Sequence, residues 1–135
     1  VLFRSLKEVE MGNWEGMTTS EIMEAWPERM RQIYTQGVDL KRGETGESWG
    51  ELTSRFGTAI NSLDKSTDEP TVVVAHGGAI RSFISSLTET DDTYAESLYT
   101  PSNTSVTHVA FIDEGQIVLD YGVAPHLETL EYRPV

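Results

Sequence analysis

The chain has 135 residues, enough for one small domain with a hydrophobic core. It carries 22 Asp and Glu residues against 10 Lys and Arg residues, and its formal net charge is -12 at pH 7. Such an acidic protein is a poor partner for nucleic acid and for anionic membranes. The sequence contains no cysteine, which excludes disulfides and a thiol nucleophile, and no apolar run long enough to span a membrane.

The first five residues have the character of a cloning remnant. The chain has no initiator Met, and Leu2-Phe3-Arg4-Ser5 is one reading frame of a common sequencing-adapter end. We therefore predict that residues 1–5 are not native and that residues 1–135 form a single domain that is incomplete at the N-terminus. No signal-peptide core is visible, so we expect a cytoplasmic protein.

Two helices are predicted after a short irregular loop. Residues 6–16 mix acidic and apolar side chains with two glycines, which is typical of a packed loop anchored by Trp14. Thr18 and Glu21 have the spacing of a capping box, which predicts a helix start. Pro27 ends this helix and begins a second one, which stops near Gly37.

A third helix is predicted after the polar loop of residues 38–46. In that loop we interpret Lys41 and Arg42 as a solvated surface pair, with a phosphate contact as the alternative. Ser48 and Glu51 form a second capping box. Apolar residues then recur at helical spacing, namely Leu52, Phe56, Ile60 and Leu63.

The centre of the sequence is a β-prone run that ends in histidine and two glycines. Residues 71–75, TVVVA, predict a parallel strand that is buried on both faces. His76, Gly77 and Gly78 follow, and a helix is predicted over residues 80–87. This turn suits an anionic ligand, because glycines allow close backbone approach and helix N-termini carry unpaired donors. The alternative is a plain turn in which His76 only caps the helix.

The rest of the chain predicts a β-hairpin. An acidic stretch, residues 88–92, and a short helical turn, residues 94–98, come first. Strands are predicted over residues 105–112 and 116–121, joined by Asp113-Glu114-Gly115. Only one parallel-strand candidate precedes the hairpin, so the predicted sheet is short of strands.

Three sequence elements together resemble the histidine phosphatase superfamily, also called the phosphoglycerate mutase-like family. They occur in the family's order and spacing, and the resemblance runs from about Leu6 to the end of the chain. The elements are Leu6-x-Glu8-x-x-x-Gly12-x-Trp14-Glu15-Gly16, then Gly46-Glu47-Ser48, then Ala75-His76-Gly77-Gly78-x-x-Arg81.

The resemblance implies a three-layer α/β/α sandwich that lacks the family's first strand and helix. By position, Glu8 corresponds to the general acid that protonates the leaving oxygen. His76 corresponds to the second active-site histidine, which binds the phosphoryl oxygens, and Gly77 offers its backbone N–H to the phosphate. These residue types suit phosphoryl transfer, because the leaving alkoxide needs a proton and the transition state spreads negative charge over oxygens. Glu47 and Ser48 correspond to a structural element.

One catalytic motif of the family is missing. Its nucleophilic histidine lies in an Arg-His-Gly motif near the N-terminus, and the 135 residues contain no such motif. His108 is expected on a strand or at the surface, and His126 in a structural role. We therefore expect the C-terminal portion of a histidine phosphatase, acting through a phosphohistidine on a small phosphorylated substrate and inactive by itself.

Several alternatives remain open at this point. The short stretch between Glu8 and His76 resembles the compact phosphatases, but phosphoglycerate mutase-type transfer is the nearest alternative. A second is a non-enzymatic remnant that binds a phosphorylated ligand or a protein. A metal-dependent hydrolase is less consistent with the sequence, since the three histidines lack ligand spacing. We expect no metal and no other cofactor.

Overall fold

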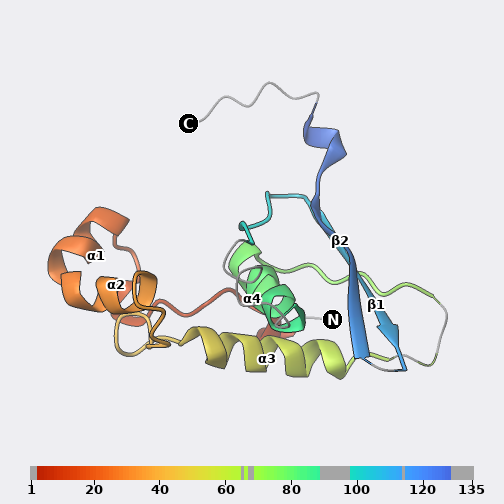
Figure 1. The fold of residues 1–135 in the computed structure, drawn as a ribbon, viewed down its shortest axis with the longest axis horizontal. Helices are drawn as coiled ribbons and strands as arrows, with labels where there is room; N and C mark the ends of the chain where they lie inside the picture. The colour runs from red at the N-terminus through yellow and green to blue at the C-terminus, as the bar shows by residue number, and fades with distance from the viewer. Residues whose placement is uncertain (1–2, 65, 67–68, 89–97, 114, 129–135) are drawn as a thin grey trace. The chain divides into compact units, whose positions relative to one another are not determined.

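The computed structural model describes residues 3–64, 66, 69–88, 98–113 and 115–128 (Figure 1). The chain forms two compact units, Val1–Ala75 and His76–Val135. Such a division occurs within one domain as well as between two, so the single domain over residues 1–135 stays a prediction. Among the described residues, no helix combines the length and apolar character that crossing a bilayer requires.

Two short helices follow the first loop of the first unit. Helix α1 spans Thr19–Ala25, and the predicted capping box is present. The Glu21 N–H donates to Thr18 Oγ1 at 3.3 Å, and the Thr18 N–H donates back to Glu21 Oε2 at 2.7 Å. Helix α2, Pro27–Tyr34, starts at the predicted proline and contacts α1 (Figure 1). Gly37 follows with a φ of +66°, a conformation that favours glycine at a helix end.

A small hydrophobic cluster holds these two helices to the loop before them. Trp14 lies in the short 3₁₀ helix η2, Gly12–Trp14, and is only 2% exposed. It is clustered with the buried residues Ile22 and Ile33. The prediction of a loop anchored by Trp14 is therefore confirmed. Partly buried apolar side chains complete this cluster: Met11, Met17, Trp26, Met30 and Leu40.

Helix α3, Trp49–Asn61, is the longest helix of the first unit that the structure describes. The predicted capping box of Ser48 and Glu51 is present at its start. Asp39 adds a second cap, because its carboxylate accepts hydrogen bonds from the Trp49 and Gly50 N–H groups at 2.7 and 3.0 Å. The apolar stripe of α3 is buried, with Leu52 at 0% exposure. Helix α3 also contacts the 3₁₀ helix η1, Arg4–Leu6, near the start of the chain.

The second unit contains one helix and a β-hairpin. Helix α4 spans Gly77–Leu87 and contacts strand β2. Strands β1, Val106–Ile112, and β2, Gly115–Val123, pair antiparallel with Ile112 opposite Gly115, so the predicted hairpin is confirmed. A 3₁₀ helix, η3, covers Pro125–Leu127. The predicted acidic stretch and helical turn fall largely in residues 89–97, outside the described residues.

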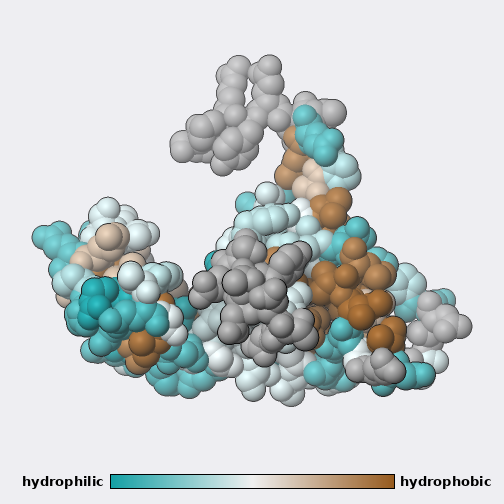
Figure 2. All heavy atoms as spheres, viewed as in Figure 1, coloured by the Kyte–Doolittle hydropathy of each residue, from teal (hydrophilic) through white to brown (hydrophobic). Residues whose placement is uncertain are grey.

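The hairpin leaves many apolar side chains in contact with solvent. Figure 2 shows hydrophobic residues gathered over β1 and β2. The more exposed of them are Val106, Phe111, Ile112, Ile117, Leu119 and Val123. Isolated two-stranded sheets are marginally stable in water, and side chains that remain exposed add little to the stability of the unit.

The predicted central strand is wrong for this structure. Residues 71–75 have no strand assignment, and in the described part of the chain they make no backbone hydrogen bond. Val72 and Val74 are 86% and 87% exposed. The physical reason is that β propensity only expresses itself against a pairing strand, and no described segment pairs with this one.

Candidate active site

Glu8 lies in an irregular stretch that follows η1. Residues 7–10 belong to no helix or strand, and Glu8 is partly buried. Its Oε1 accepts a hydrogen bond from the Val9 N–H at 2.9 Å, which orients the carboxyl group against its own backbone. The stretch therefore needs other contacts to fix its path.

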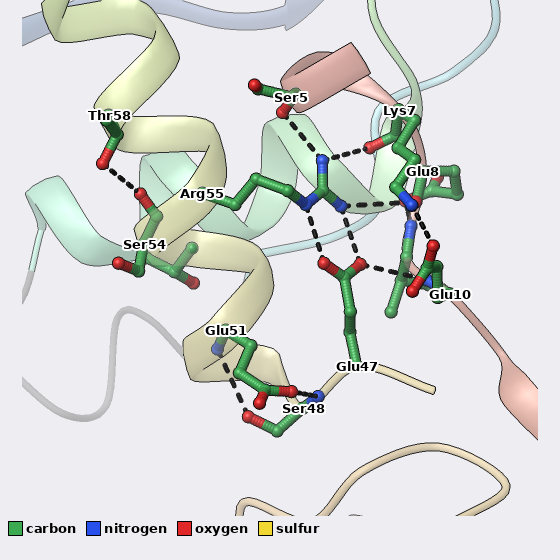
Figure 3. A network of polar contacts seen from close by, with 12 residues as sticks. Ser5, Lys7, Glu8, Glu10, Glu47, Ser48, Glu51, Ser54, Arg55 and Thr58 are labelled. Atoms are coloured by element: carbon green, nitrogen blue, oxygen red, sulfur yellow. Dashed lines mark hydrogen bonds and ion pairs between the residues drawn. The ribbon is translucent and has the colours of Figure 1, made fainter. Parts of the chain in front are cut away.

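The side chain of Arg55, on α3, supplies those contacts (Figure 3). Its Nη1 donates to the carbonyl oxygens of Ser5 at 2.7 Å and Lys7 at 3.1 Å, and its Nη2 donates to the Glu8 carbonyl at 3.4 Å. Its Nε and Nη2 also donate to the two carboxylate oxygens of Glu47, both at 2.7 Å. These five contacts match the five N–H donors of a guanidinium group.

Glu47 links the same arginine to the next part of the stretch. Its Oε2 accepts from the Glu10 N–H at 3.1 Å, and its own N–H donates to the Glu10 carbonyl at 2.8 Å. The side chains of Glu47 and Arg55 are only 14% and 19% exposed. Hydrogen bonds from Arg55 hold the pKa of the Glu47 carboxyl below its ordinary value of 4.5, so the pair is ionised at neutral pH. We call these contacts, made by Ser5, Lys7, Glu8, Glu10, Glu47 and Arg55, the Arg55 network.

His76 occupies the N-cap position of α4 in the second unit. The Ile80 N–H donates to its backbone carbonyl at 2.9 Å, but its side chain makes no capping hydrogen bond. The imidazole is exposed, and it has no hydrogen-bond partner among the described residues. His76 therefore occupies the capping position that the alternative of a plain turn predicts, but its ring makes no capping hydrogen bond and has no partner among the described residues.

Gly77 begins α4 at a crowded position. A Cβ atom there would lie 2.8 Å from Thr100 Cγ2 and 3.3 Å from the Pro101 carbonyl oxygen. Within the part of the chain that the structure describes, no acceptor is found for the Gly77 N–H. The absence of a side chain thus lets residues 100–101 approach the start of the helix, where the N–H points out of the helix as an open donor.

A reciprocal pair of tyrosines fixes the residues beside Gly77. The Tyr121 hydroxyl donates to the Tyr99 carbonyl at 2.6 Å, and the Tyr99 hydroxyl donates to the Tyr121 carbonyl at 3.2 Å. The two rings meet edge to face with centroids 5.3 Å apart. Burial raises the pKa of the Tyr121 hydroxyl, while the positive charge of Arg81 opposes that shift. The connection between residues 99–101 and β2 is therefore well anchored.

The family model of the histidine phosphatase superfamily (branch 1) matches residues 1–124. The chain belongs to the histidine phosphatase superfamily. Two Arabidopsis thaliana proteins are similar to it over nearly its whole length. Phosphoglycerate mutase-like protein 4 is 32% identical over 127 residues, covering 93% of this chain and 54% of that protein. Metal-independent phosphoserine phosphatase is 28% identical over 128 residues, covering 94% and 52%. The chain thus spans about half the length of both relatives.

Solved structures share the histidine phosphatase fold with this chain. YhfR of Bacillus stearothermophilus has a TM-score of 0.77 at 22% identity, over 93% of this chain and 62% of that one. A mycobacterial glucosyl-3-phosphoglycerate phosphatase, solved in complex with VO3, has a TM-score of 0.71 at 20% identity, over 90% and 64%. The predicted α/β class with a phosphoglycerate mutase-like fold is therefore confirmed.

The histidine phosphatase residues predicted from the sequence fall into different units. Glu8 belongs to the first unit, and His76 and Gly77 belong to the second. Within their own surroundings, Glu8 is fixed by the Arg55 network, and His76 and Gly77 lie side by side at the start of α4. Their catalytic roles stay predictions.

The other two histidines are accounted for by local contacts. His108 lies on β1 with its side chain 58% exposed and its Nδ1 3.8 Å from Asp120 Oδ2, as expected for a surface strand position. His126 Nε2 lies 2.8 Å from Thr104 Oγ1, which supports a structural role. Over the described ranges, no three His, Asp or Glu side chains gather closely enough to hold a metal ion.

The prediction of a solvated Lys41–Arg42 pair is wrong for Arg42. Lys41 is exposed and pairs with Glu51 at 2.9 Å, but Arg42 is only 6% exposed. The Arg42 Nη1 donates to the Leu40 carbonyl at 3.2 Å, and its Cζ lies 5.4 Å from the centroid of the Trp49 ring. The physical reason is that an aromatic face and a backbone carbonyl can replace water around a guanidinium group.

Sequence reasoning missed Arg55. It identified Glu47 and Ser48 as a structural element but did not find the partner of Glu47. One signal was available, because Arg55 falls between Leu52 and Phe56 on the apolar side of a well-predicted helix. A cation in that position needs a buried partner, and an acidic residue just before the helix is the nearest candidate.

Proposed function

We propose that this chain carries the general acid and one phosphate-binding histidine of a histidine phosphatase that hydrolyses small phosphomonoesters. The observation that supports this most is the start of α4, where neither the His76 ring nor the Gly77 N–H has a hydrogen-bond partner among the described residues. An exposed imidazole beside an open helix N-terminus is suited to phosphoryl oxygens. Family membership and the two phosphatase relatives support the same activity.

The reaction proceeds in two steps in this proposal. A histidine nitrogen attacks phosphorus and the ester P–O bond breaks, while the Glu8 carboxylic acid gives its proton to the leaving oxygen. Water then attacks the phosphohistidine, the P–N bond breaks, and inorganic phosphate is released as Glu8 recovers a proton from that water. His76 and the Gly77 N–H stabilise the negative charge that develops on the phosphoryl oxygens in both steps.

The attacking histidine is supplied by sequence outside these 135 residues in this proposal. The chain contains no Arg-His-Gly motif, and its three histidines have the positions described above. We therefore expect the 135-residue chain to release no phosphate from p-nitrophenyl phosphate. If the 135-residue chain hydrolyses p-nitrophenyl phosphate and His76→Ala abolishes this activity, the proposal that the nucleophile lies outside the chain is wrong.

The decisive experiment compares variants of the protein expressed from the whole open reading frame. His76→Ala should lower phosphatase kcat by about 10²- to 10³-fold, as expected for the loss of one transition-state donor. His108→Ala is the matched control, because it removes an exposed histidine of the same unit and should leave kcat unchanged. A frame without an Arg-His-Gly motif, or a whole-gene protein without phosphomonoesterase activity, would overturn the proposal.

Phosphoglycerate mutase-type transfer is the second candidate, since one relative is named as phosphoglycerate mutase-like. The short stretch between Glu8 and His76 favours the phosphatase. The two activities give different products from 3-phosphoglycerate, and the ³¹P NMR spectrum separates them. Release of inorganic phosphate supports the phosphatase, whereas accumulation of 2-phosphoglycerate supports the mutase.

A further inference from the structure

Helix α3 fixes a stretch of the chain that has no secondary structure. No described strand pairs with residues 7–10, yet three of the carbonyl oxygens along residues 5–8 accept hydrogen bonds from one guanidinium group (Figure 3). Both backbone polar groups of Glu10 are bonded to Glu47. The Arg55–Glu47 ion pair thus supplies backbone hydrogen bonds of the kind that a neighbouring strand supplies in a sheet.

The geometry points to Arg55 as the positioning residue for Glu8, acting together with Glu47. This inference rests on the proposed function, because it takes Glu8 as the general acid. Arg55 contacts the backbone on both sides of the Glu8 Cα atom, at the Lys7 and Glu8 carbonyls. These contacts fix the position of the Cα atom from which the Glu8 side chain extends. A general acid works only within hydrogen-bond reach of the leaving oxygen, so small displacements of its backbone are costly.

The role of Glu47 is to hold the guanidinium in one orientation. Its two carboxylate oxygens bind Nε and Nη2 of Arg55 in a fork, which leaves Nη1 and the second Nη2 hydrogen directed at the three carbonyls. A fork of this kind restricts rotation of the guanidinium plane, which a lysine ammonium cannot reproduce. The low exposure of both side chains further limits their motion.

Leaving groups of different stability separate positioning of an acid from a purely structural role. A p-nitrophenolate is a stable anion and departs without a proton, whereas an alkoxide departs only when it is protonated. Misplacing Glu8 should therefore slow hydrolysis of an alkyl phosphate such as glycerol 2-phosphate and leave p-nitrophenyl phosphate nearly unaffected. A change that merely reduces the amount of folded protein lowers both rates equally.

The experiment uses the protein expressed from the whole open reading frame and measures kcat and KM on both substrates. For Arg55→Lys, which keeps the charge and loses the fork, we expect about a 10²-fold loss of kcat on glycerol 2-phosphate with KM unchanged. On p-nitrophenyl phosphate we expect little change. Glu47→Gln should show the same selectivity with a smaller loss. Arg31→Lys is the matched control, because its arginine pairs with Glu28 on the exposed face of α2.

Three outcomes decide the inference. A loss confined to the alkyl phosphate supports it, and equal losses on the two substrates overturn it in favour of a structural role. If the unchanged protein hydrolyses neither substrate, the proposed function fails and the positioning role fails with it. Where Arg55→Lys does not fold, hydrogen exchange in Glu47→Gln replaces it: the amides of residues 7–10 should exchange faster while those of α3 keep their protection, and a uniform change would overturn the inference.

Discussion

Two stretches of the first unit, the one around Glu8 and the one that leads to His76, differ in how the protein holds them. Glu8 lies in a stretch with no regular structure, residues 7–10, but Arg55 and Glu47 bind three of its four residues, namely Lys7, Glu8 and Glu10. Residues 71–75, which lead to His76, have the composition of a buried strand, yet Val74 is 87% exposed and the described structure shows no backbone partner for them. In these two stretches, the backbone is held where hydrogen-bond partners are present and not where the residue composition favours a strand.

Removing Arg55 should have the largest effect, because it would leave the stretch around Glu8 with as little support as residues 71–75. Arg55→Ala leaves the Glu47 carboxylate and three carbonyls without their donors in a poorly exposed place, and we expect a loss of about 2–4 kcal/mol in the free energy of unfolding. Urea denaturation followed by tryptophan fluorescence measures this loss. Arg31→Ala removes an exposed ion pair and should leave the free energy of unfolding nearly unchanged. Equal costs for the two variants would show that the Arg55 network contributes no special stability.

Loosening the helix that presents Arg55 should have the next largest effect. Ser48→Ala removes the hydroxyl that accepts from the Glu51 N–H at 3.2 Å and donates to Asp39 at 2.9 Å, and we expect a cost of about 1–2 kcal/mol. Thr18→Ala, at the exposed start of α1, is the comparison and should cost about 0.5–1 kcal/mol. Hydrogen exchange of the first turn of α3 locates the change, and an unchanged first turn would contradict it.

Acid should weaken the Arg55 network, because it protonates the Glu47 carboxylate. The pKa of this carboxyl is lowered in the folded chain, so the folded chain binds fewer protons and loses stability as pH falls below the ordinary glutamate value of 4.5. The contribution is fully present at neutral pH. Glu47→Gln should therefore show a smaller loss of unfolding free energy between pH 7 and pH 4 than the unchanged protein. A parallel decline in both proteins would exclude Glu47 as the titrating group.

The smallest effect is expected in the run that composition marks as core. Val74→Thr exchanges a methyl for a hydroxyl at a solvent-exposed position, so the free energy of unfolding should change by less than about 0.5 kcal/mol. If Val74 lay in a buried strand, the same substitution would lower the free energy of unfolding much more, because it would bury a hydroxyl group. Ile84→Thr on α4, at a position 1% exposed, is the matched buried control and should be clearly destabilising. Similar costs at the two positions would show that residues 71–75 are covered in solution.

The sequence predicted local structure well wherever the signal was itself local. Both capping boxes, the proline that starts α2 and the β-hairpin are present as expected. These features depend on neighbours a few residues apart in the chain, and the three family elements added the fold class. The central strand could not be judged in the same way, because its state depends on a distant partner.

Glu8, His76 and Gly77 were identified as candidate site residues by their positions in the family's motifs, and their catalytic roles stay predictions. The residue that supports the stretch around Glu8 was missed. Arg55 and Arg42 do not stand out, since an arginine in a sequence looks solvated unless its partner is known. Arg55 meets the Ser5 carbonyl across a separation of 50 positions, and no pattern in the sequence announces that contact.

The hydrogen bonds from Arg55 to residues 5, 7 and 8 end on carbonyl oxygens, a group that every amino acid carries. The network therefore imposes no side-chain identity on the positions it grips. Substitutions at positions 5 and 7 leave its acceptors in place. The side chain at position 8 can likewise change without loss of its contact to Arg55, because that contact ends on the backbone carbonyl.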